Sequence, residues 1–253
     1  MAHSPWQHYN PAKARLRQTI WDRLATAGAT VTPPHGHIPN FVGAIAAAER
    51  LTTLASWQQA TVIKCNPDQP QAPVRHQALA AGKTLYMAVL QLVNESCFVA
   101  ITREQLPQGL DLAIAAEKNN ILRYGRPVSF AEMKTIDLAV VGCVAVSVAG
   151  GRTGKGAGFA DLELAMLQHF GLVDEKTTIV TTVHDLQVVS PTALPLEAHD
   201  WPLDWLCTPT TIYQTHHNQL QPQGLDWQQI RPQQWETIPI LKKLYAENSE
   251  KSP

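Results

Sequence analysis

The chain has 253 residues, of which 45% are apolar and 16% charged, a balance that predicts a globular protein with a sizeable core and excludes a disordered chain. Its formal net charge of −1 offers no electrostatic footprint for nucleic acid or an anionic membrane, and no apolar run is long enough to cross a bilayer. The N-terminal residues lack the pattern of a signal peptide, and the four cysteines form no C-x-x-C pair. We therefore expect a cytoplasmic protein with reduced core cysteines and with no nucleic-acid or membrane partner.

The first predicted element is a helix that begins near residue 10. Asn10 is a good N-cap and Pro11 suits the first helical position, while Gly28 ends the segment. Lys13 and Arg17 are four residues apart, so they share one face of this helix. The spacing places two cations side by side.

Helices and strands then alternate along the chain. Helices are predicted over residues 41–54, 74–81, 112–124 and 159–170. Strands are predicted over residues 60–65, 84–89, 138–147, 177–183 and 205–213. The run 138–147 is uncharged and apolar on both faces, which is typical of the centre of a parallel sheet covered by helices. The alternation predicts an α/β fold with a mostly parallel, doubly wound sheet and helices on both faces.

The composition changes near the C-terminus. Residues 10–215 are expected to form the α/β domain, and residues 216–253, rich in Gln, Pro and Trp, a C-terminal extension that packs on its surface. A short helix is expected near residues 240–245, and disorder after Asn248.

A glycine-rich loop, Gly150 to Gly158, connects the apolar strand to the helix that starts at residue 159. Glycines let a backbone approach phosphate closely, and Arg152 and Lys155 add two positive charges. The loop is not a Walker A loop, because Gly156 follows Lys155 where Ser or Thr is required. Asp161, at the start of the helix, is a candidate magnesium ligand. A flexible strand-to-helix turn, and an Asp161 that complements the helix dipole, are the structural alternatives.

The loop and its flanks resemble the signature of the 5-formyltetrahydrofolate cyclo-ligases (methenyltetrahydrofolate synthetases), which have a strand, a G-x-R-x-G-x-G-x-G loop and an aromatic-aromatic-Asp step. Residues 13–17 are similar to the K-x-x-L-R helix of the family, and residues 195–200 to its late P-x-x-x-H-D segment. The resemblance is closer to the methenyltetrahydrofolate synthetase domain-containing branch, through residues 38–41, 64–68, 81–84 and 154–156. It covers about residues 10 to 215.

This resemblance implies a three-layer α/β/α fold and ATP-dependent cyclisation of 5-formyltetrahydrofolate to 5,10-methenyltetrahydrofolate through a phosphorylated formyl group. ATP and Mg²⁺ are the implied cofactors, a reduced folate or similar small molecule the substrate, and a monomer or homodimer the expected state. The residues matched to the family pattern are Lys155 and Arg152 as catalytic cations, Lys13, Arg17, Gly151, Gly154, Gly156 and Gly158 as nucleotide-binding residues, and Asp161 as the metal ligand.

The chain departs from the family pattern at one step of the signature. The cyclo-ligases usually have two aromatics before the aspartate, whereas this chain has Phe159 and Ala160. Losing the second ring removes a stacking partner for the pteridine. The alternatives are an ATP-using paralogue that acts on a different small molecule and a non-catalytic regulatory member. Retention of Arg152, Lys155 and Asp161 together argues against the regulatory alternative.

Several other polar residues have open roles in the sequence. His199 and Asp200 form either a catalytic pair or a turn that leads into a strand, and Lys83 is either a ligand contact or a solvated residue at a helix end. His35, His37, His216 and His217 lack a third metal ligand at fixed spacing and are interpreted as loop or surface histidines.

Overall fold

The computed structural model describes residues 10–89 and 96–250. Within them, eight strands form one sheet. These strands are β1 (Val62–Cys65), β2 (Thr84–Ala88), β3 (Phe98–Ile101), β4 (Arg126–Val128), β5 (Leu138–Val140), β8 (Thr178–Thr182), β10 (Trp205–Cys207) and β11 (Ile212–Gln214). Their order is β11-β10-β8-β5-β1-β2-β3-β4. The five strands from β10 to β2 are parallel, and β11, β3 and β4 join the edges antiparallel.

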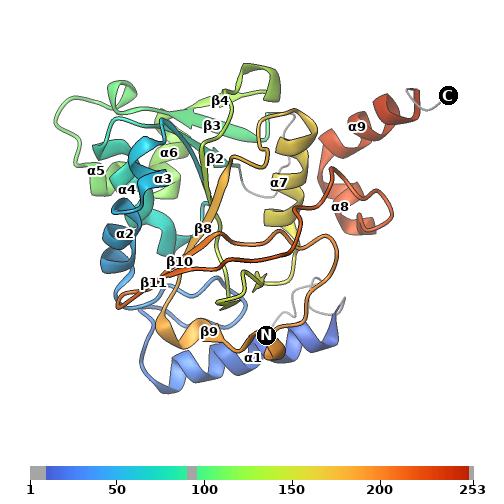
Figure 1. The fold of residues 1–253 in the computed structure, drawn as a ribbon. Helices are drawn as coiled ribbons and strands as arrows, with labels where there is room; N and C mark the ends of the chain where they lie inside the picture. The colour runs from blue at the N-terminus through green and yellow to red at the C-terminus, as the bar shows by residue number, and fades with distance from the viewer. Residues whose placement is uncertain (1–9, 90–95, 251–253) are drawn as a thin grey trace.

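Helices cover both faces of this sheet (Figure 1). One face carries α2 (Ala44–Thr52), α3 (Ala55–Gln59), α4 (Ala72–Ala80), α5 (Leu112–Ala115) and α6 (Lys118–Tyr124), whose apolar residues form one core with the strands. The other carries α7 (Phe159–His169), and α8 (Pro232–Thr237) and α9 (Pro239–Glu250) pack outside it in a second core. This arrangement confirms the predicted three-layer α/β/α fold.

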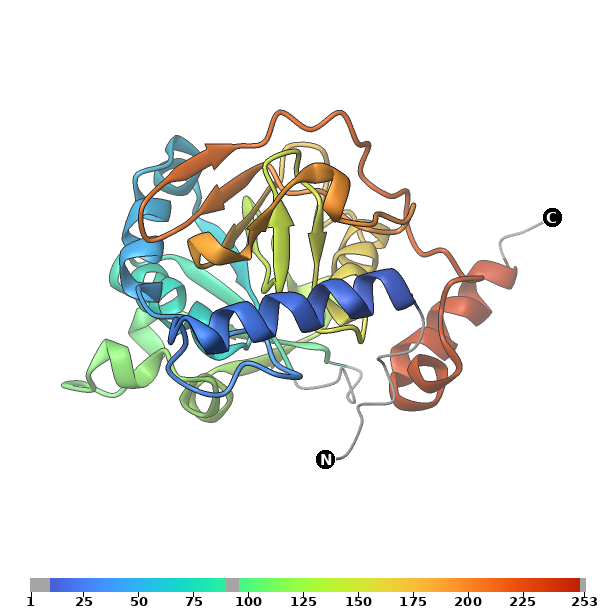
Figure 2. The ribbon, with the colours of Figure 1, turned by 90° about the horizontal axis from the view of Figure 1, so that it is seen from below.

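A second, small sheet has the strand order β7-β6-β9 in the described residues. It consists of β6 (Ala145–Ser147), β7 (Arg152–Thr153) and β9 (Val188–Val189). Helix α1 (Pro11–Thr26) lies across it (Figure 2), and Ile20 and Leu24 pack against Val144 beneath the helix. The small sheet thereby brings the N-terminal helix next to the glycine-rich loop.

The start of α1 follows the sequence prediction closely. The side chain of Asn10 accepts a hydrogen bond from the backbone N–H of Lys13 at 2.9 Å, and Pro11 occupies the first helical position. Both Lys13 and Arg17 point into the protein and are buried, while Arg15 is exposed. The cap therefore fixes which face of the helix carries the buried cations.

The prediction of one strand from Leu138 to Ser147 was wrong. The chain leaves the central sheet after β5 and enters the small sheet at β6. At Gly142, between them, a Cβ atom would come within 2.9 Å of Asp68 and 3.2 Å of Ile38, so only glycine fits without rearrangement. Both β5 and β6 are fully buried, so their sequences, apolar except for Ser147, do not show that they belong to different sheets.

Two further predicted elements are split. The helix predicted over 112–124 breaks at Glu117, whose ψ of 138° is extended, into α5 and α6. The strand predicted over 205–213 is the hairpin β10–β11, which turns at Pro209 and closes with a hydrogen bond from Thr208 N–H to the Thr211 carbonyl. The helix predicted over 41–54 is α2, followed by α3, and β3, β4 and β9 were not predicted.

Short 3₁₀ turns connect several of these elements, at Gln69–Gln71, Arg103–Gln105, Phe130–Glu132, Asp185–Gln187 and Pro191–Ala193. At the C-terminus, α9 continues to Glu250. Disorder was expected after Asn248, but residues 249 and 250 belong to this helix. Residues 251–253 lie outside the described residues. None of the described helices is both long enough and apolar enough to cross a membrane.

Candidate active site

The glycine-rich loop begins as a hairpin of the small sheet. Strands β6 and β7 are antiparallel, and Gly150 at the turn has a φ of +87°. A Cβ atom at Gly151 would meet the side chains of Leu194 and Leu196, so this glycine packs against residues 194–196 and does not line the cavity described next. The loop therefore follows β6 of the small sheet, and not a strand of the central sheet as the sequence predicted.

A cavity of about 360 Å³ opens beside the rest of the loop. We call it the cationic cavity. Its walls come from α1, from the chain around residues 36–38 and 66–68, from the loop and the start of α7, from residues 197–200, and from Arg231. Of the residues predicted for the site, those that line it are Lys13, Arg17, Arg152, Gly154, Lys155, Gly156, Gly158 and Asp161.

Lys13 is held by two carboxylates on one wall of this cavity. Its Nζ atom lies 2.6 Å from Asp200 and 2.8 Å from Glu197, and its side chain is only 8% exposed. Burial and the nearby Asp161 raise the pKa of Asp200, and Lys13 opposes that rise. The backbone N–H of Glu197 also donates to Asp200 at 2.7 Å, so Asp200 both caps this turn and pairs with Lys13.

Arg152 and Asp161 form a second ion pair. The NH2 group of Arg152 lies 2.5 Å from Oδ1 of Asp161, and its Nε donates to the Trp201 carbonyl at 2.9 Å. Burial alone would lower the pKa of Arg152, but Asp161 and other acidic groups nearby outweigh it and raise the pKa. Trp201 N–H also donates to Oδ1 of Asp161, at 3.0 Å. Arg152 therefore lines the cavity with its guanidinium already bonded.

Arg17 differs from these two cations. It is buried, and its NH1 group donates at 3.3 Å to the Thr153 hydroxyl. No carboxylate among the described residues forms an ion pair with it. Burial, and then the neighbouring Arg231 guanidinium, lower the pKa of Arg17, although an arginine remains protonated at neutral pH. Two guanidinium groups on one cavity wall favour an anionic ligand.

Lys155 is the most accessible of the cations in the loop. Its side chain is 44% exposed, and its Nζ atom lies 3.5 Å from Asp68 across the cavity. Gly156 and Gly158, on either side of Ala157, both have positive φ, at 113° and 72°, which favours glycine. The exposed Lys155 side chain has room to reorient toward a ligand, and the glycines allow the sharp turns of the backbone on which it stands.

Two buried cations that the sequence did not predict as site residues support the wall of the cavity. The fully buried Lys64 lies 2.6 Å from Glu163, which lines the cavity. Arg75, also fully buried, donates to the carbonyls of Asn66 and Asp68 at 2.7 and 3.0 Å and so fixes that wall. A lysine within the apolar run 60–65 could have indicated a buried ion pair. Arg75, in contrast, lies on a helix whose sequence has no distinguishing pattern.

Arg231, from the C-terminal segment, was also missed. It donates to the Gly156 carbonyl at 2.7 Å, and Gln234 donates to the Ala157 carbonyl at 3.0 Å. The segment was expected only to pack on the surface, and its sequence carries no pattern that marks a site.

Oxygen ligands for a divalent cation are present on this wall. Oδ2 of Asp161 takes no hydrogen bond from the described residues, whereas Oδ1 takes two. Glu197, His199 and Asp200 offer ligand atoms within 4.8 Å of one another. Lys13 already occupies the space between Glu197 and Asp200. The donor set fits a hard cation such as Mg²⁺, with Asp161 as the carboxylate best placed to accept it.

The remaining polar candidates have structural contacts. Lys83 is buried, contrary to both readings of its role, and donates to the carbonyls of Trp57 and Ala60 at 2.9 and 2.5 Å. His35 bonds Asp22 at 2.8 Å, and His217 bonds Asp204 at 3.1 Å. Within the described residues, His35, His37, His216 and His217 belong to no cluster with metal-ligand geometry.

Comparison with known proteins places the chain in a family. The model of the "5-formyltetrahydrofolate cyclo-ligase family" matches residues 10–209. A curated methenyltetrahydrofolate synthase domain-containing protein from Bos taurus is 37% identical over 92% of this chain, and its Danio rerio counterpart is 35% identical over 90%. The chain spans 62% and 60% of the lengths of these relatives.

A solved structure shares the fold. The NMR structure of Aquifex aeolicus 5,10-methenyltetrahydrofolate synthetase superposes with a TM-score of 0.51 at 16% sequence identity, covering 82% of this chain and 95% of that one. This likeness concerns the fold. The family match over most of the chain shows that the chain belongs to the 5-formyltetrahydrofolate cyclo-ligase family.

Proposed function

We propose that this protein cyclises 5-formyltetrahydrofolate to 5,10-methenyltetrahydrofolate at the expense of ATP. The observation that carries the proposal is the clustering of Arg17, Lys155 and Arg231 around the glycine-rich loop of a chain that belongs to the cyclo-ligase family. These three cations, one of them buried with no carboxylate partner in the described residues, suit the charge of a triphosphate.

The proposed reaction has two steps. The γ-phosphoryl group of ATP passes to the formyl oxygen and ADP is released. The side-arm nitrogen of the folate then attacks the formyl carbon, loses its proton, and phosphate leaves. Such chemistry needs positioning and neutralisation of charge more than acid–base catalysis.

The residues divide this work according to their geometry. Lys155, whose side chain is exposed at the cavity, stabilises the charge that develops on the phosphoryl group. Arg152 acts by orienting Asp161, because its own guanidinium is bonded to that carboxylate. Arg17 binds the nucleotide phosphates beside the backbone of Gly154, Gly156 and Gly158, and Lys13 positions Glu197 and Asp200. Mg²⁺, held by Asp161, would neutralise charge on the phosphate oxygens.

The cellular setting follows from the cysteines. The four cysteines are free and buried, which fits a reducing compartment, so we propose a cytoplasmic enzyme.

One observation favours a second candidate, an ATP-using paralogue with another small-molecule substrate. Ala160 lines the cationic cavity at the position where the cyclo-ligases usually carry an aromatic ring. A smaller residue there weakens recognition of a pteridine and leaves nucleotide binding intact.

A direct assay separates the two candidates. Purified protein with Mg-ATP and 5-formyltetrahydrofolate is followed for the absorbance of the methenyl product, with omission of ATP as the control. ATP-dependent product formation supports the cyclo-ligase. Binding of ATP, seen as a raised Tm, without any methenyl product favours the paralogue.

A further inference from the structure

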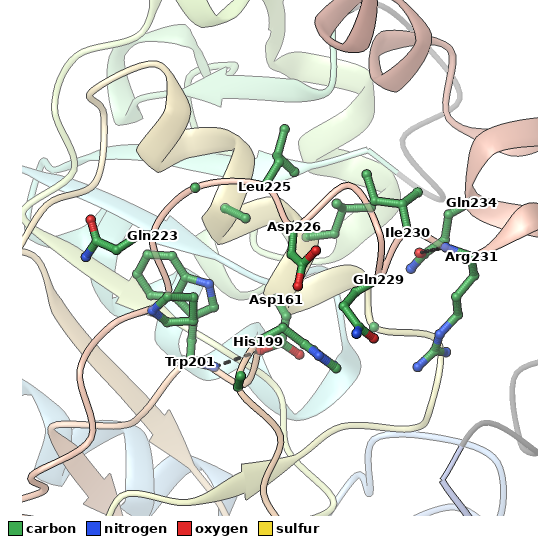
Figure 3. Close-up of a pocket in the computed structure, with 16 residues that line it drawn as sticks. Asp161, His199, Trp201, Gln223, Leu225, Asp226, Gln229, Ile230, Arg231 and Gln234 are labelled. Atoms are coloured by element: carbon green, nitrogen blue, oxygen red, sulfur yellow. Dashed lines mark hydrogen bonds between the residues drawn. The ribbon is translucent and has the colours of Figure 1, made fainter. Parts of the chain in front are cut away.

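A second cavity, of about 340 Å³, lies beside the cationic cavity (Figure 3). We call it the tail cavity, because residues 222–234 of the C-terminal segment build one side of it. The start of α7 and residues 198–201 build the other. The two cavities share Gly158, Asp161, His199 and Arg231 in their linings, so one ligand can extend from one into the other.

The C-terminal wall is bonded to the rest of the protein. Besides the two bonds from Arg231 and Gln234 to the glycine-rich loop, Gly224 N–H donates to the Gln168 side chain at 2.5 Å. Gln219 donates to the Asp200 carbonyl at 2.7 Å. The wall is thus attached both to α7 and to the turn that holds Lys13, which makes the tail cavity a built part of the molecule.

The two linings hold different charged groups. Lys155 and Arg17 line only the cationic cavity, which also contains carboxylates, whereas Asp226 lines only the tail cavity. Asp161 and Arg231 line both. In Figure 3 the Asp226 carboxyl group points toward Asp161 and His199. This arrangement suits a ligand with its anionic end near Arg17 and Lys155 and a hydrogen-bond-donating end at Asp226.

The apolar residues of the tail cavity complete this pattern. Leu162, Ala165, Trp201, Leu225 and Ile230 line it together with the side-chain amides of Gln223 and Gln229. A few polar groups in an apolar lining are typical of small-molecule sites, and the volume is within the usual range. Flat apolar faces combined with N–H donors at one edge are the properties of an amino-substituted nitrogen heterocycle, which a carboxylate can bind through two hydrogen bonds.

We propose that the tail cavity binds a flat, amino-substituted nitrogen heterocycle, belonging to a ligand whose reacting or anionic part lies in the cationic cavity. This inference rests on the proposed function, and it extends the site to a segment beyond residue 209, where the family match ends. Under the proposed function two ligands carry such a ring, ATP as adenine and 5-formyltetrahydrofolate as its pterin.

Two variants test the assignment in the full chain. Ala165→Phe fills the tail cavity from α7, and Asp226→Asn removes one carboxylate. The matched controls are His169→Phe, an exposed position at the end of the same helix, and Glu236→Gln, an exposed carboxylate on α8; neither lines a cavity. Calorimetry measures the binding of Mg-ATP, inorganic triphosphate and 5-formyltetrahydrofolate, and circular dichroism checks that each variant folds.

We expect each variant to lower the affinity for one of the two heterocyclic ligands about tenfold or more. This is the effect of losing one charge-assisted hydrogen bond or one apolar contact. Triphosphate binding and both controls should stay within about twofold. A loss confined to ATP assigns the cavity to adenine, and one confined to 5-formyltetrahydrofolate assigns it to the pterin. Unchanged affinity for both ligands in both folded variants overturns the inference alone. If the wild type binds neither ligand, the proposed function fails and this inference fails with it.

Discussion

The Nζ atom of Lys13, in the first turn of α1, lies 2.6 Å from a carboxylate oxygen of Asp200, 187 residues further along the chain. Both side chains are more than nine-tenths buried. The pair joins the N-terminal helix to the turn that borders both cavities, so the fold and the site depend on the same contact.

Lys13→Met should therefore lower the free energy of unfolding by about 3 kcal/mol at pH 7, because it leaves two carboxylates without their cation. Arg15→Met, an exposed position on the same helix, is the control and should change little. Chemical denaturation measures both. Equal stability of the two variants would show that the pair contributes nothing.

The same variant should have a distinctive pH dependence. Lys13 opposes the rise in the pKa of Asp200, so its removal raises that pKa further above the unfolded value. A carboxyl group with a raised folded pKa favours the native state below its unfolded pKa, and that contribution is lost as pH rises through the folded pKa. Relative to wild type, Lys13→Met should lose stability as pH rises from about 4. A deficit that does not change with pH would contradict this explanation.

Arg152→Ala should destabilise the protein by about 3 kcal/mol, because it removes a buried guanidinium with its bond to the Trp201 carbonyl and leaves the partly buried Asp161 carboxylate without its cation. Arg152→Ala together with Asp161→Asn should be less damaging than the sum of the two changes. Strict additivity in this cycle would mean that the two residues do not act as a pair.

Lys155→Ala should behave in the opposite way. Its side chain is 44% exposed and makes only a 3.5 Å contact with Asp68, so the Tm should be unchanged. Turnover should fall about a hundredfold, the typical cost of removing one group that stabilises transition-state charge. Lys176→Ala, an exposed lysine outside both cavities, is the control. Wild-type kinetics in the Lys155 variant would show that the loop is structural.

Ala160→Tyr should improve use of the folate substrate. Ala160 lines the cationic cavity, and an aromatic stack contributes on the order of 1 kcal/mol, so KM for 5-formyltetrahydrofolate should fall several-fold. Ala160→Leu adds bulk without a ring and serves as the comparison. If both variants have the same KM, stacking is not what the position supplies.

The sequence predicted the layers of the fold because helical and extended segments alternate clearly from residue 60 onward. It did not reveal that the run 138–147 serves two sheets, since uninterrupted burial looks the same in both and the only break is Gly142. The same limit applies to the hairpin at Pro209, where two short strands of similar composition follow one another.

For the site, the sequence predicted the residues with a local pattern. Lys13, Arg17, Gly154, Gly156 and Gly158 line one cavity, whereas Gly151 does not, and the roles predicted for these residues stay predictions. Arg75 and Arg231 could not be found in this way. Their contacts are with backbone carbonyls, and in the case of Arg231 the partner, Gly156, lies 75 residues away. Such bonds depend on tertiary structure and leave no mark in local sequence.

The stoichiometry of the reaction tests most directly whether this protein is an ATP-dependent cyclo-ligase. Wild-type protein is mixed with Mg-ATP and 5-formyltetrahydrofolate, and ADP, phosphate and the methenyl product are quantified over the same time course. We expect the three to form in equal amounts and only when both substrates are present, and Lys155→Ala to slow all three together. ADP formation without methenyl product, or methenyl product without ADP, would contradict it.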